Sequence, residues 1–319
     1  MPAIYLTEDD VFNLINMEKT IELVEEAFKS YATGTSYNMP RKRLRIKKGT
    51  LHMLPAAIPY KDVLGFKAYT SFREGNFFKV FLYCGQSGKL LSIIEANELG
   101  RLRTGAASAV ATKYMAKKNS KVGFIFGAGY QAEKQLEAID HIMKLEKIYV
   151  SNTNVDKGIA FTKKMQQLLN TSVERVEDVS KYLYKADIMT TITWVSKPLF
   201  NDDWLSQDGV HINAAGSNSL IRSEIPEKTI ERSALIAVDA KDIAELECGD
   251  ILPSLEKGRL HFNELSELGD IVAGKIIGRK DEKDLTIFES HGMGLQDIIC
   301  AEYIYKNAVK NKIGQNLPF

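Results

Sequence analysis

The chain has 319 residues, of which 45% are apolar and 26% are charged, a composition typical of a packed globular protein rather than a disordered one. A chain of this length predicts two domains, at about 100–200 residues per domain. The 42 Lys and Arg residues nearly balance the 41 Asp and Glu residues, so we expect no general attraction to nucleic acid or to an anionic membrane surface.

Membrane insertion and secretion are not expected either. No apolar run approaches the roughly 18 residues that a membrane-spanning helix needs. The amino terminus, MPAIYLTEDDVF, lacks the basic stretch and apolar core of a signal peptide. Cys84, Cys248 and Cys300 are too few and too far apart for a disulfide framework or a zinc motif. We therefore expect a protein of the reducing cytoplasm.

The first hundred residues carry helical signals followed by extended ones. Thr7 with Asp10 three residues later predicts a helix start. The basic segment MPRKRLRIKKG has two interpretations, a solvated edge strand or a strand that binds an anion. The strand-like runs that follow predict an antiparallel or mixed sheet; they are LHML, GFKAYTSF, KVFLYC and KLLSIIEA.

From residue 97 onward the pattern changes. ELGRLRTGAASAVATKYMAKK is rich in small residues and predicts a tightly packed helix that joins two domains. Strand-like and helix-like segments then alternate, which predicts an α/β fold, a Rossmann-type doubly wound parallel sheet covered on both faces. We expect helices over about 130–144 and 156–169, and another in the tail GMGLQDIICAEYIYKNAVK. The expected strands are KVGFIFG, KIYVS, ADIMTTIT, GVHINAAG, ALIAVDA and LTIFES.

A glycine-rich turn follows the first strand of this alternating series. Gly127, Gly129 and Ala132 form a G-x-G-x-x-A pattern directly before a helix. The first glycine permits the tight turn, the second lets a pyrophosphate approach the backbone, and the small third residue lets helix and strand pack closely. The free amides of the helix start then face the phosphates. We therefore expect a dinucleotide site.

The end of the second strand bears on the choice of cofactor. NAD-specific sites usually place an acidic residue there, about twenty residues beyond the glycines. This chain has Ser151, Asn152, Thr153 and Asn154 instead, with Lys157 nearby and no Arg. Nothing in this stretch repels a 2′-phosphate, so we expect NADP or NAD, with NADP preferred.

Three basic residues outside the nucleotide fold are candidates for substrate binding. Arg41, Lys67 and Arg103 can each be read as a solvated surface charge. Arg103 is the exception, because it opens the small-residue helix, which should be buried, and a buried Arg needs an anion. The five His residues form no H-x-x-x-H pair and no Cys/His cluster in sequence, so we expect no metal site.

Seven segments in a fixed order give the chain a specific resemblance. It is similar to the ornithine cyclodeaminase/mu-crystallin family over nearly its whole length. The resemblance implies a homodimer in which residues 119–290 form the dinucleotide-binding domain. Residues 1–118 plus 291–319 then form an α+β domain for substrate binding and dimerisation. The segments are LHMLPA, GFKAY, RLRTGAASAVATKYMA, FGAGYQAEKQLEA, HINAAGSN, ECGDIL and ESHGMGLQD.

The resemblance also implies the positions of site residues. Arg41, Lys67 and Arg103 match the family's substrate-carboxylate residues, Lys67 and Asn218 match catalytic positions, and His291 lies beside the substrate. The implied cofactor contacts, with those of the glycine turn and the second strand, are Arg103, Thr104, Gly127, Gly129, Tyr130, Gln131, Asn152, Thr153, Thr193, Ala215, Gly216, Ser217, Asn218, Arg222 and Ser290.

Two departures from the cyclodeaminase pattern point to the reaction. Asn218 stands where cyclodeaminases carry an Asp general base, and His52 stands where they carry a Glu. An amide cannot accept a proton at neutral pH, whereas reduction of an α-imino acid makes no such demand. We therefore expect an NAD(P)H-dependent oxidoreductase of small α-imino or α-amino acids. The alternatives are an ornithine cyclodeaminase and a non-catalytic, crystallin-like ligand-binding protein.

Overall fold

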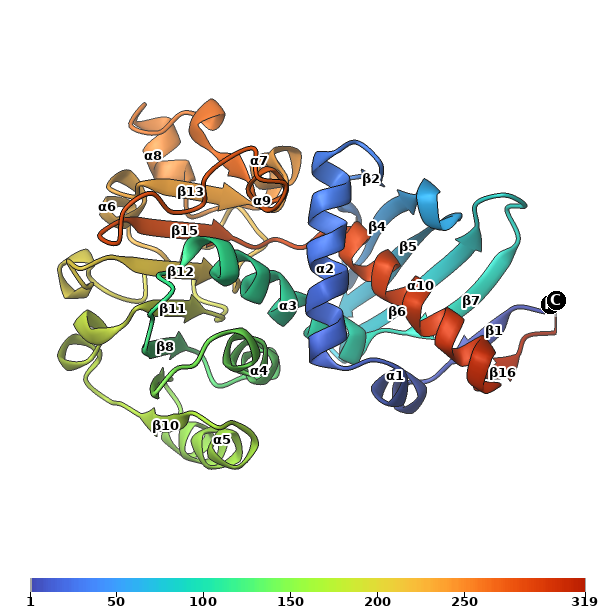
Figure 1. The fold of residues 1–319 in the computed structure, drawn as a ribbon, viewed down its shortest axis with the longest axis horizontal. Coiled ribbons are helices and arrows are strands. Elements are labelled where there is room, and N and C mark those ends of the chain that lie inside the picture. The colour runs from blue at the N-terminus through green and yellow to red at the C-terminus, as the bar shows by residue number, and fades with distance from the viewer. Residues whose placement is uncertain (1, 319) are drawn as a thin grey trace. The chain divides into compact units, whose positions relative to one another are not determined.

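A computed structural model of the chain describes residues 2–318. The chain forms two compact units: residues up to 103 together with those from 292 onward, and residues 104–291 (Figure 1). Helix α3 (Asn97–Met115) contains the point where the first unit passes into the second. The functional domains expected at 1–118 plus 291–319 and at 119–290 stay a prediction. No helix within residues 2–318 is long and apolar enough to cross a membrane.

The first unit is built on a mixed eight-stranded sheet. Its order is β16-β1-β7-β6-β5-β4-β2, and the basic strand β3 pairs with β4 beside this path, as an edge strand. Within residues 2–318, β1 and β7 form the one parallel pair of this sheet. The strands are β1 (Ile4–Leu6), β2 (Tyr37–Asn38), β3 (Lys42–Ile46), β4 (Gly49–Ile58), β5 (Val63–Phe72), β6 (Gly75–Cys84), β7 (Leu90–Glu95) and β16 (Gln315–Asn316).

Three helices pack in this unit, α1 (Glu8–Leu14), α2 (Met17–Ala32) and α10 (Gly294–Asn311). The side chain of Thr7 caps α1 and bonds reciprocally with Asp10, as the sequence predicts. In Figure 1, α10 lies across strands β4, β5 and β6, with which it is in contact. The residues of these strands that are buried alternate with more exposed ones, so one face of the sheet carries the core.

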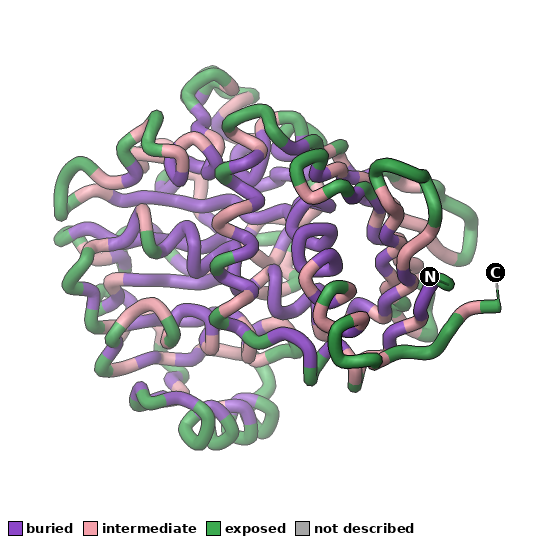
Figure 2. Tube along the Cα trace, turned by 45° about the vertical axis from the view of Figure 1, so that its right-hand side comes forward, coloured by how far each residue is buried: buried purple, intermediate pink, exposed green. Residues whose placement is uncertain are grey.

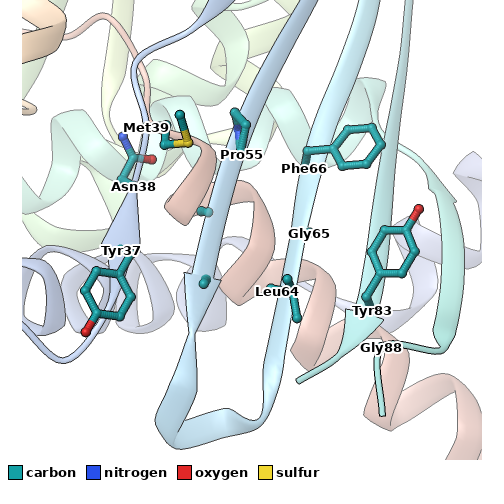
Figure 3. Close-up of a pocket in the computed structure, with 11 residues that line it drawn as sticks. Tyr37, Asn38, Met39, Pro55, Leu64, Gly65, Phe66, Tyr83 and Gly88 are labelled. Carbon is teal, nitrogen blue, oxygen red and sulfur yellow. The ribbon is translucent and has the colours of Figure 1, made fainter. Parts of the chain in front are cut away.

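The other face of this sheet is apolar and more exposed. Figure 3 shows Phe66 and Tyr83 on neighbouring strands of this face, where they line a pocket with Leu64, Tyr37 and Met39. Leu64, Tyr37 and Met39 are exposed to solvent. Large exposed apolar groups on one surface are unusual in a monomer and mark an interaction site.

The second unit contains an eight-stranded sheet in which every pair is parallel. Its order is β10-β9-β8-β11-β12-β15-β13-β14, so the first strand β8 lies between β9 and β11. This is the switch point at which doubly wound folds bind nucleotides. The strands are β8 (Val122–Phe126), β9 (Lys147–Ser151), β10 (Ser172–Arg175), β11 (Ile188–Thr191), β12 (Val210–Ala214), β13 (Leu235–Val238), β14 (Ser266–Glu267) and β15 (Leu285–Glu289).

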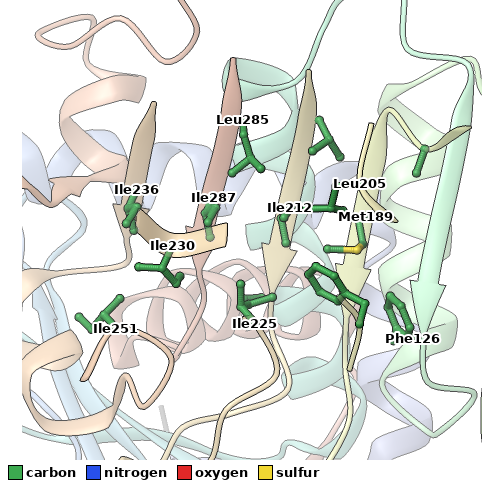
Figure 4. Close-up of a cluster of buried hydrophobic side chains, with 14 of the residues drawn as sticks. Phe126, Met189, Leu205, Ile212, Ile225, Ile230, Ile236, Ile251, Leu285 and Ile287 are labelled. Atoms are coloured by element: carbon green, nitrogen blue, oxygen red, sulfur yellow. The ribbon is translucent and has the colours of Figure 1, made fainter. Parts of the chain in front are cut away.

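Both faces of the parallel sheet carry a hydrophobic core, which confirms the predicted fold class. One cluster packs α4 (Ala132–Ile142) and α5 (Val155–Leu168) against the strands through residues such as Leu136 and Phe161. The other contains the isoleucines of Figure 4, among them Ile212, Ile230 and Ile287. The central strands β11, β12 and β15 are accordingly buried at every residue, and buried residues fill the interior of the tube in Figure 2. The remaining helices are α6 (Glu227–Glu231), α7 (Lys241–Glu247), α8 (Leu252–Glu256) and α9 (Leu268–Val272).

Candidate active site

The first unit buries four charged side chains together, which we call the cation cluster: Arg41, Lys67, Arg103 and Asp297. Their exposed fractions are 6%, 2%, 8% and 0%. Arg41 precedes β3, Lys67 lies on β5, Arg103 lies on α3, and Asp297 lies in the first turn of α10. The cluster thus lies between the core face of the sheet and the start of α10. The interpretation of Arg41, Lys67 and Arg103 as solvated surface charges is therefore wrong.

Asp297 joins two of the cations. The Lys67 ammonium donates to Oδ1 of Asp297 at 2.9 Å, and Nε of Arg103 lies 3.3 Å from the same oxygen. Arg103 also donates from Nη1 to Oε1 of Gln296 at 3.1 Å. Gly292 adopts φ of +87° and lies next to Arg103. A β-carbon on Gly292 would lie 2.5 Å from Nη1 of Arg103, so glycine lets the backbone pass this close. The cluster holds three basic side chains and one carboxylate, and such basic groups bind carboxylate ligands through charge-assisted hydrogen bonds.

The surroundings of the cation cluster strongly lower the pKa of Lys67. Burial lowers the pKa of its ammonium from 10.5 to about 7, and the charge of Arg103 acts in the same direction. Asp297 opposes both effects. Lys67 is therefore poised to gain or lose a proton near neutral pH, which suits a proton donor as well as a carboxylate ligand.

An aromatic stack lies on the strands beside Lys67. The ring of His52 on β4 stacks on Tyr69 at 4.2 Å between centroids, and Tyr69 stacks on Phe78 at 4.7 Å. Tyr69 is two residues from Lys67 on β5, so their side chains share a face. Burial, followed by the charge of Arg41, lowers the pKa of His52 to about 4. This imidazole is therefore neutral at pH 7, unlike the Glu that cyclodeaminases carry.

The glycine turn lies at the carboxyl end of β8, in the second unit. Gly127 adopts φ of +117°, and its N–H donates to the carbonyl of Ser151 at the end of β9 at 2.9 Å. A β-carbon on Gly129 would meet nothing within 4 Å, so its backbone stays open to a ligand. Ala132 is buried at the start of α4, where it packs in the hydrophobic core. These features fit the pyrophosphate of a dinucleotide.

A buried acid that the sequence analysis missed holds the next two loops together. The carboxylate of Glu224 accepts from Thr191 Oγ1 at 2.9 Å, from the N–H of Thr193 at 2.7 Å and from the N–H of Gly216 at 3.0 Å. Asp250 in turn accepts from the N–H of Glu224 at 2.6 Å. Burial raises the pKa of both carboxyl groups. The loops after β11 and β12, where cofactor contacts are predicted, are thereby fixed.

Cys248, Glu289 and His291 form a group that no sequence spacing revealed. One potential metal-ligating atom from each lies within 4.8 Å of the others, and all three are buried. Burial raises the pKa of the Cys248 thiol and, with the charge of Asp250, that of Glu289. Both shifts favour the protonated form of these groups, whereas a metal ligand has to be deprotonated. The N–H of His291 donates to Asp239 at 2.5 Å.

The structure assembles most predicted cofactor positions along one edge of the parallel sheet. Gly127, Gly129, Tyr130 and Gln131 follow β8, Asn152 and Thr153 follow β9, and Thr193 follows β11. Ala215, Gly216, Ser217 and Asn218 follow β12, and Ser290 follows β15. Thr104 lies on α3, and the guanidinium of Arg222 lies 4.2 Å above the ring of Trp194. The contacts that these residues make with a cofactor stay predictions.

The chain matches the ornithine cyclodeaminase/mu-crystallin family over residues 2–312. The chain belongs to this family. A Bacillus cereus Δ1-pyrroline-2-carboxylate reductase is 31% identical, over 96% of this chain and 97% of that protein. The solved structure of a Thermococcus litoralis Δ1-pyrroline-2-carboxylate reductase with NADH and L-proline is 30% identical, covers 98% of this chain and 100% of its own, and has a TM-score of 0.93.

An archaeal alanine dehydrogenase, solved as a dimer with bound NAD, is 28% identical over 100% of both chains, with a TM-score of 0.93. The ornithine cyclodeaminase/mu-crystallin family and the class of enzyme, a nicotinamide-dependent oxidoreductase, are thus predicted correctly from the sequence. Asp297 and Glu224 were missed. ESHGMGLQD was recognised, and the acid near the start of its apolar helix was the available signal for Asp297.

Proposed function

We propose that this enzyme reduces the C=N bond of a small, ring-shaped α-imino acid such as Δ1-pyrroline-2-carboxylate. The observation that carries the proposal is the cation cluster, where Lys67 and Arg103 pair with Asp297 and the charge of the buried Arg41 acts on Lys67. Guanidinium and ammonium groups of this kind bind a substrate carboxylate through charge-assisted hydrogen bonds. The similarity to pyrroline-2-carboxylate reductases supports the choice of ring.

The residues of the chain bind the substrate and supply a proton. Arg41 and Arg103 hold the carboxylate, which orients the imine carbon. A reduced nicotinamide, when bound, supplies the hydride for that carbon. The imine nitrogen takes one proton as the C=N bond becomes CH–NH, and the Lys67 ammonium, with its pKa near 7, is the donor that the cluster offers. The aromatic stack of His52 and Tyr69 provides an uncharged wall for the ring.

The preference for NADP over NAD belongs to this proposal. The glycine turn fits the pyrophosphate that both cofactors share. Asn152 and Thr153 directly follow β9, where an acid would otherwise bind the ribose hydroxyls and repel a 2′-phosphate. We therefore expect NADPH to bind more tightly than NADH.

The test is oxidation of NADPH and NADH followed by absorbance against a panel of substrates. Δ1-Pyrroline-2-carboxylate should react fastest, ahead of pyruvate with ammonia and oxaloacetate with ammonia. Equal rates with all three substrates would show that the enzyme does not require a ring. If neither NADPH nor NADH is oxidised, that result overturns the proposal. A non-catalytic ligand-binding protein predicts that last result.

The cyclodeaminase alternative has its own test at Asn218. The wild-type enzyme should not release ammonia from ornithine, because an amide cannot act as the base. An Asn218→Asp variant restores a carboxylate, and a well-placed general base contributes about 10²–10⁴ in rate. His52→Glu combined with Asn218→Asp completes the cyclodeaminase pattern. Rapid release of ammonia by the wild type, without imine reduction, would favour the alternative.

We also propose that the enzyme is a cytoplasmic homodimer formed through the first unit. Its exposed apolar sheet face, with Leu64, Phe66 and Tyr83, needs a covering layer, and an archaeal relative is a dimer. The three cysteines are free thiols, as a reducing cytoplasm keeps them. Light scattering at micromolar concentration should give twice the mass of the chain. Leu64→Asp should reduce that mass to a monomer's, and a monomeric wild type would contradict the proposal.

A further inference from the structure

An arginine from a neighbouring strand reaches the ribose end of the nucleotide site. Arg175 is the last residue of β10 and is the register partner of Val150 on β9. The N–H of Val176 continues the ladder by donating to the Val150 carbonyl at 2.9 Å. The next residue along β9, Ser151, bonds to Gly127 of the glycine turn. The ends of β8, β9 and β10 therefore form one continuous edge.

The side chain of Arg175 packs beside Asn152 at this edge. A β-carbon placed on Gly158 of α5 would lie 2.0 Å from Oδ1 of Asn152 and 2.9 Å from Cδ of Arg175. Gly158 is therefore the point over which both side chains meet, and any larger residue would displace them. The sequence analysis found no Arg in this region because Arg175 lies more than twenty positions further along the chain.

Both side chains hold a buried polar atom without a partner. Among the described residues, neither Nε of Arg175 nor Oδ1 of Asn152 has a hydrogen-bond partner, although both atoms are shielded from solvent. An N–H donor left unpaired in such a place is costly. A bound anion that accepts from Arg175 removes that cost.

Within residues 2–318, this guanidinium has an ion pair with Glu177 that is easily exchanged. Nη1 of Arg175 donates to Oε1 of Glu177 at 3.0 Å, but the Glu177 side chain is 79% exposed, against 14% for Arg175. An ion pair with one partner in water contributes little. Glu177 can turn into solvent when a stronger anion arrives, which frees the planar fork of Arg175 for two parallel hydrogen bonds.

We propose that Arg175, positioned beside Asn152, binds the 2′-phosphate of NADPH and sets the choice between NADPH and NADH. The inference rests on the proposed use of a nicotinamide cofactor and assigns its specificity to a residue. Arg175 stands one strand away from the acid position of NAD-specific folds, and it faces an amide there instead of a carboxylate. The 2′-hydroxyl of NADH offers no charge for this guanidinium to bind.

The experiment measures binding rather than activity. Dissociation constants of the full-length protein are compared for NADPH and NADH by fluorescence titration. They are also compared for 2′,5′-ADP and 5′-AMP by calorimetry, since these two probes differ in the 2′-phosphate alone. The wild type should bind the phosphorylated member of each pair more tightly.

Arg175→Met should weaken NADPH and 2′,5′-ADP about 10–100-fold, the range of charge-assisted hydrogen bonds, and leave NADH and 5′-AMP unchanged. Glu177→Gln should strengthen NADPH binding severalfold, because it removes the competing carboxylate. Lys163→Met, a change to an exposed cation further along α5, is the matched control and should alter the ratio far less. Arg175→Lys, which keeps the charge without the fork, should recover only part of the binding.

Equal losses for both members of each pair would mean that Arg175 contacts the shared adenosine part, and would overturn the proposal. A wild type that binds NADPH and NADH equally would also overturn it, together with the expected preference for NADPH, while leaving the proposed reduction of the C=N bond intact. If the protein binds neither NADPH nor NADH, that result contradicts the proposed function instead. A temperature scan of each variant verifies folding, and unchanged NADH binding by Arg175→Met shows an intact site directly.

Discussion

The two units are both suited to bind anions, but they do so by different physical means. The first unit offers charged side chains, because Lys67 and Arg103 pair with the buried Asp297 and Arg41 is buried as well. The second unit uses backbone geometry at Gly127 and Gly129, next to the free amides of a helix start. In the first unit the free-energy cost of the arrangement is the desolvation of buried charges. In the second unit the cost is the restriction of the backbone to an unusual conformation.

This difference decides which substitutions each unit tolerates. Buried charges depend on one another, so the loss of one leaves the others uncompensated. A backbone site depends instead on the absence of side-chain atoms, so its function is lost when an atom is added. Substitutions of opposite kinds, removal of charge and addition of volume, therefore separate the two mechanisms.

The largest effect is expected from Gly129→Val. No atom lies within 4 Å of a β-carbon at this position, so the variant should fold normally while its side chain occupies the space of the pyrophosphate. Fluorescence titration should show that binding of NADPH and NADH is abolished. Gly127→Ala is the matched comparison, because its β-carbon would meet the carbonyl oxygen of Ile192 at 2.6 Å. That variant should lose thermal stability as well, and a stable Gly129→Val protein with unchanged cofactor affinity would contradict the assignment.

The same contrast explains what the sequence could predict. The glycine turn is local, since all of its residues lie within six positions and directly between a strand and a helix. Periodicity likewise predicted most strands of both sheets, together with α4, α5 and α10, because apolar spacing reports which face is buried. The short strands β1, β2, β10, β14 and β16 were missed, as segments of two to four residues show no periodicity.

The cation cluster was beyond such reasoning. Lys67 and Asp297 are 230 positions apart, and no spacing rule links residues at that distance. The sequence indicates that Arg103 needs an anion. It does not indicate whether that anion is a substrate or a side chain of the protein. In the structure, Asp297 is an ion-pair partner of Arg103. Glu224 was missed for the same reason, since it acts 33 positions from Thr191.

The next largest effect is expected from Asp297→Asn, which keeps the volume and removes the only carboxylate of the cation cluster. Lys67 and Arg103 would then repel each other without compensation, and breaking a buried pair in this way costs about 3–5 kcal/mol of unfolding free energy. Urea denaturation at pH 6, where Lys67 is charged, should show the loss at its largest. At pH 9 the loss should shrink, because Lys67 then carries no charge.

Asp203→Asn is the control for this change, since it removes the same group from a solvent-exposed ion pair with Lys228. Water already solvates both of these partners, so stability should change little. Equal effects of the two substitutions would show that the cation cluster is no more interdependent than a surface pair.

A smaller effect concerns the proton on Lys67. Its pKa in the folded protein is about 7, below the ordinary 10.5. Between these two values the unfolded chain binds a proton that the folded protein has lost, so the free energy of unfolding contributed by this group rises with pH. Ligand binding has the opposite sign, because a carboxylate favours the charged ammonium, which is present below pH 7.

We therefore expect the affinity for a carboxylate ligand to fall as pH rises above 7. Pyrrole-2-carboxylate is a suitable probe because it resembles the proposed substrate and has no basic amine. Its dissociation constant, measured by calorimetry between pH 6 and 9, should rise by at most about tenfold per pH unit, the limit for one linked proton. In Lys67→Met the dependence should be flat, since the group whose pKa lies near 7 has been removed. His52, with its pKa of about 4, remains neutral across it. An equal slope in wild type and variant would show that another group titrates, and that the proton proposed for catalysis does not reside on Lys67.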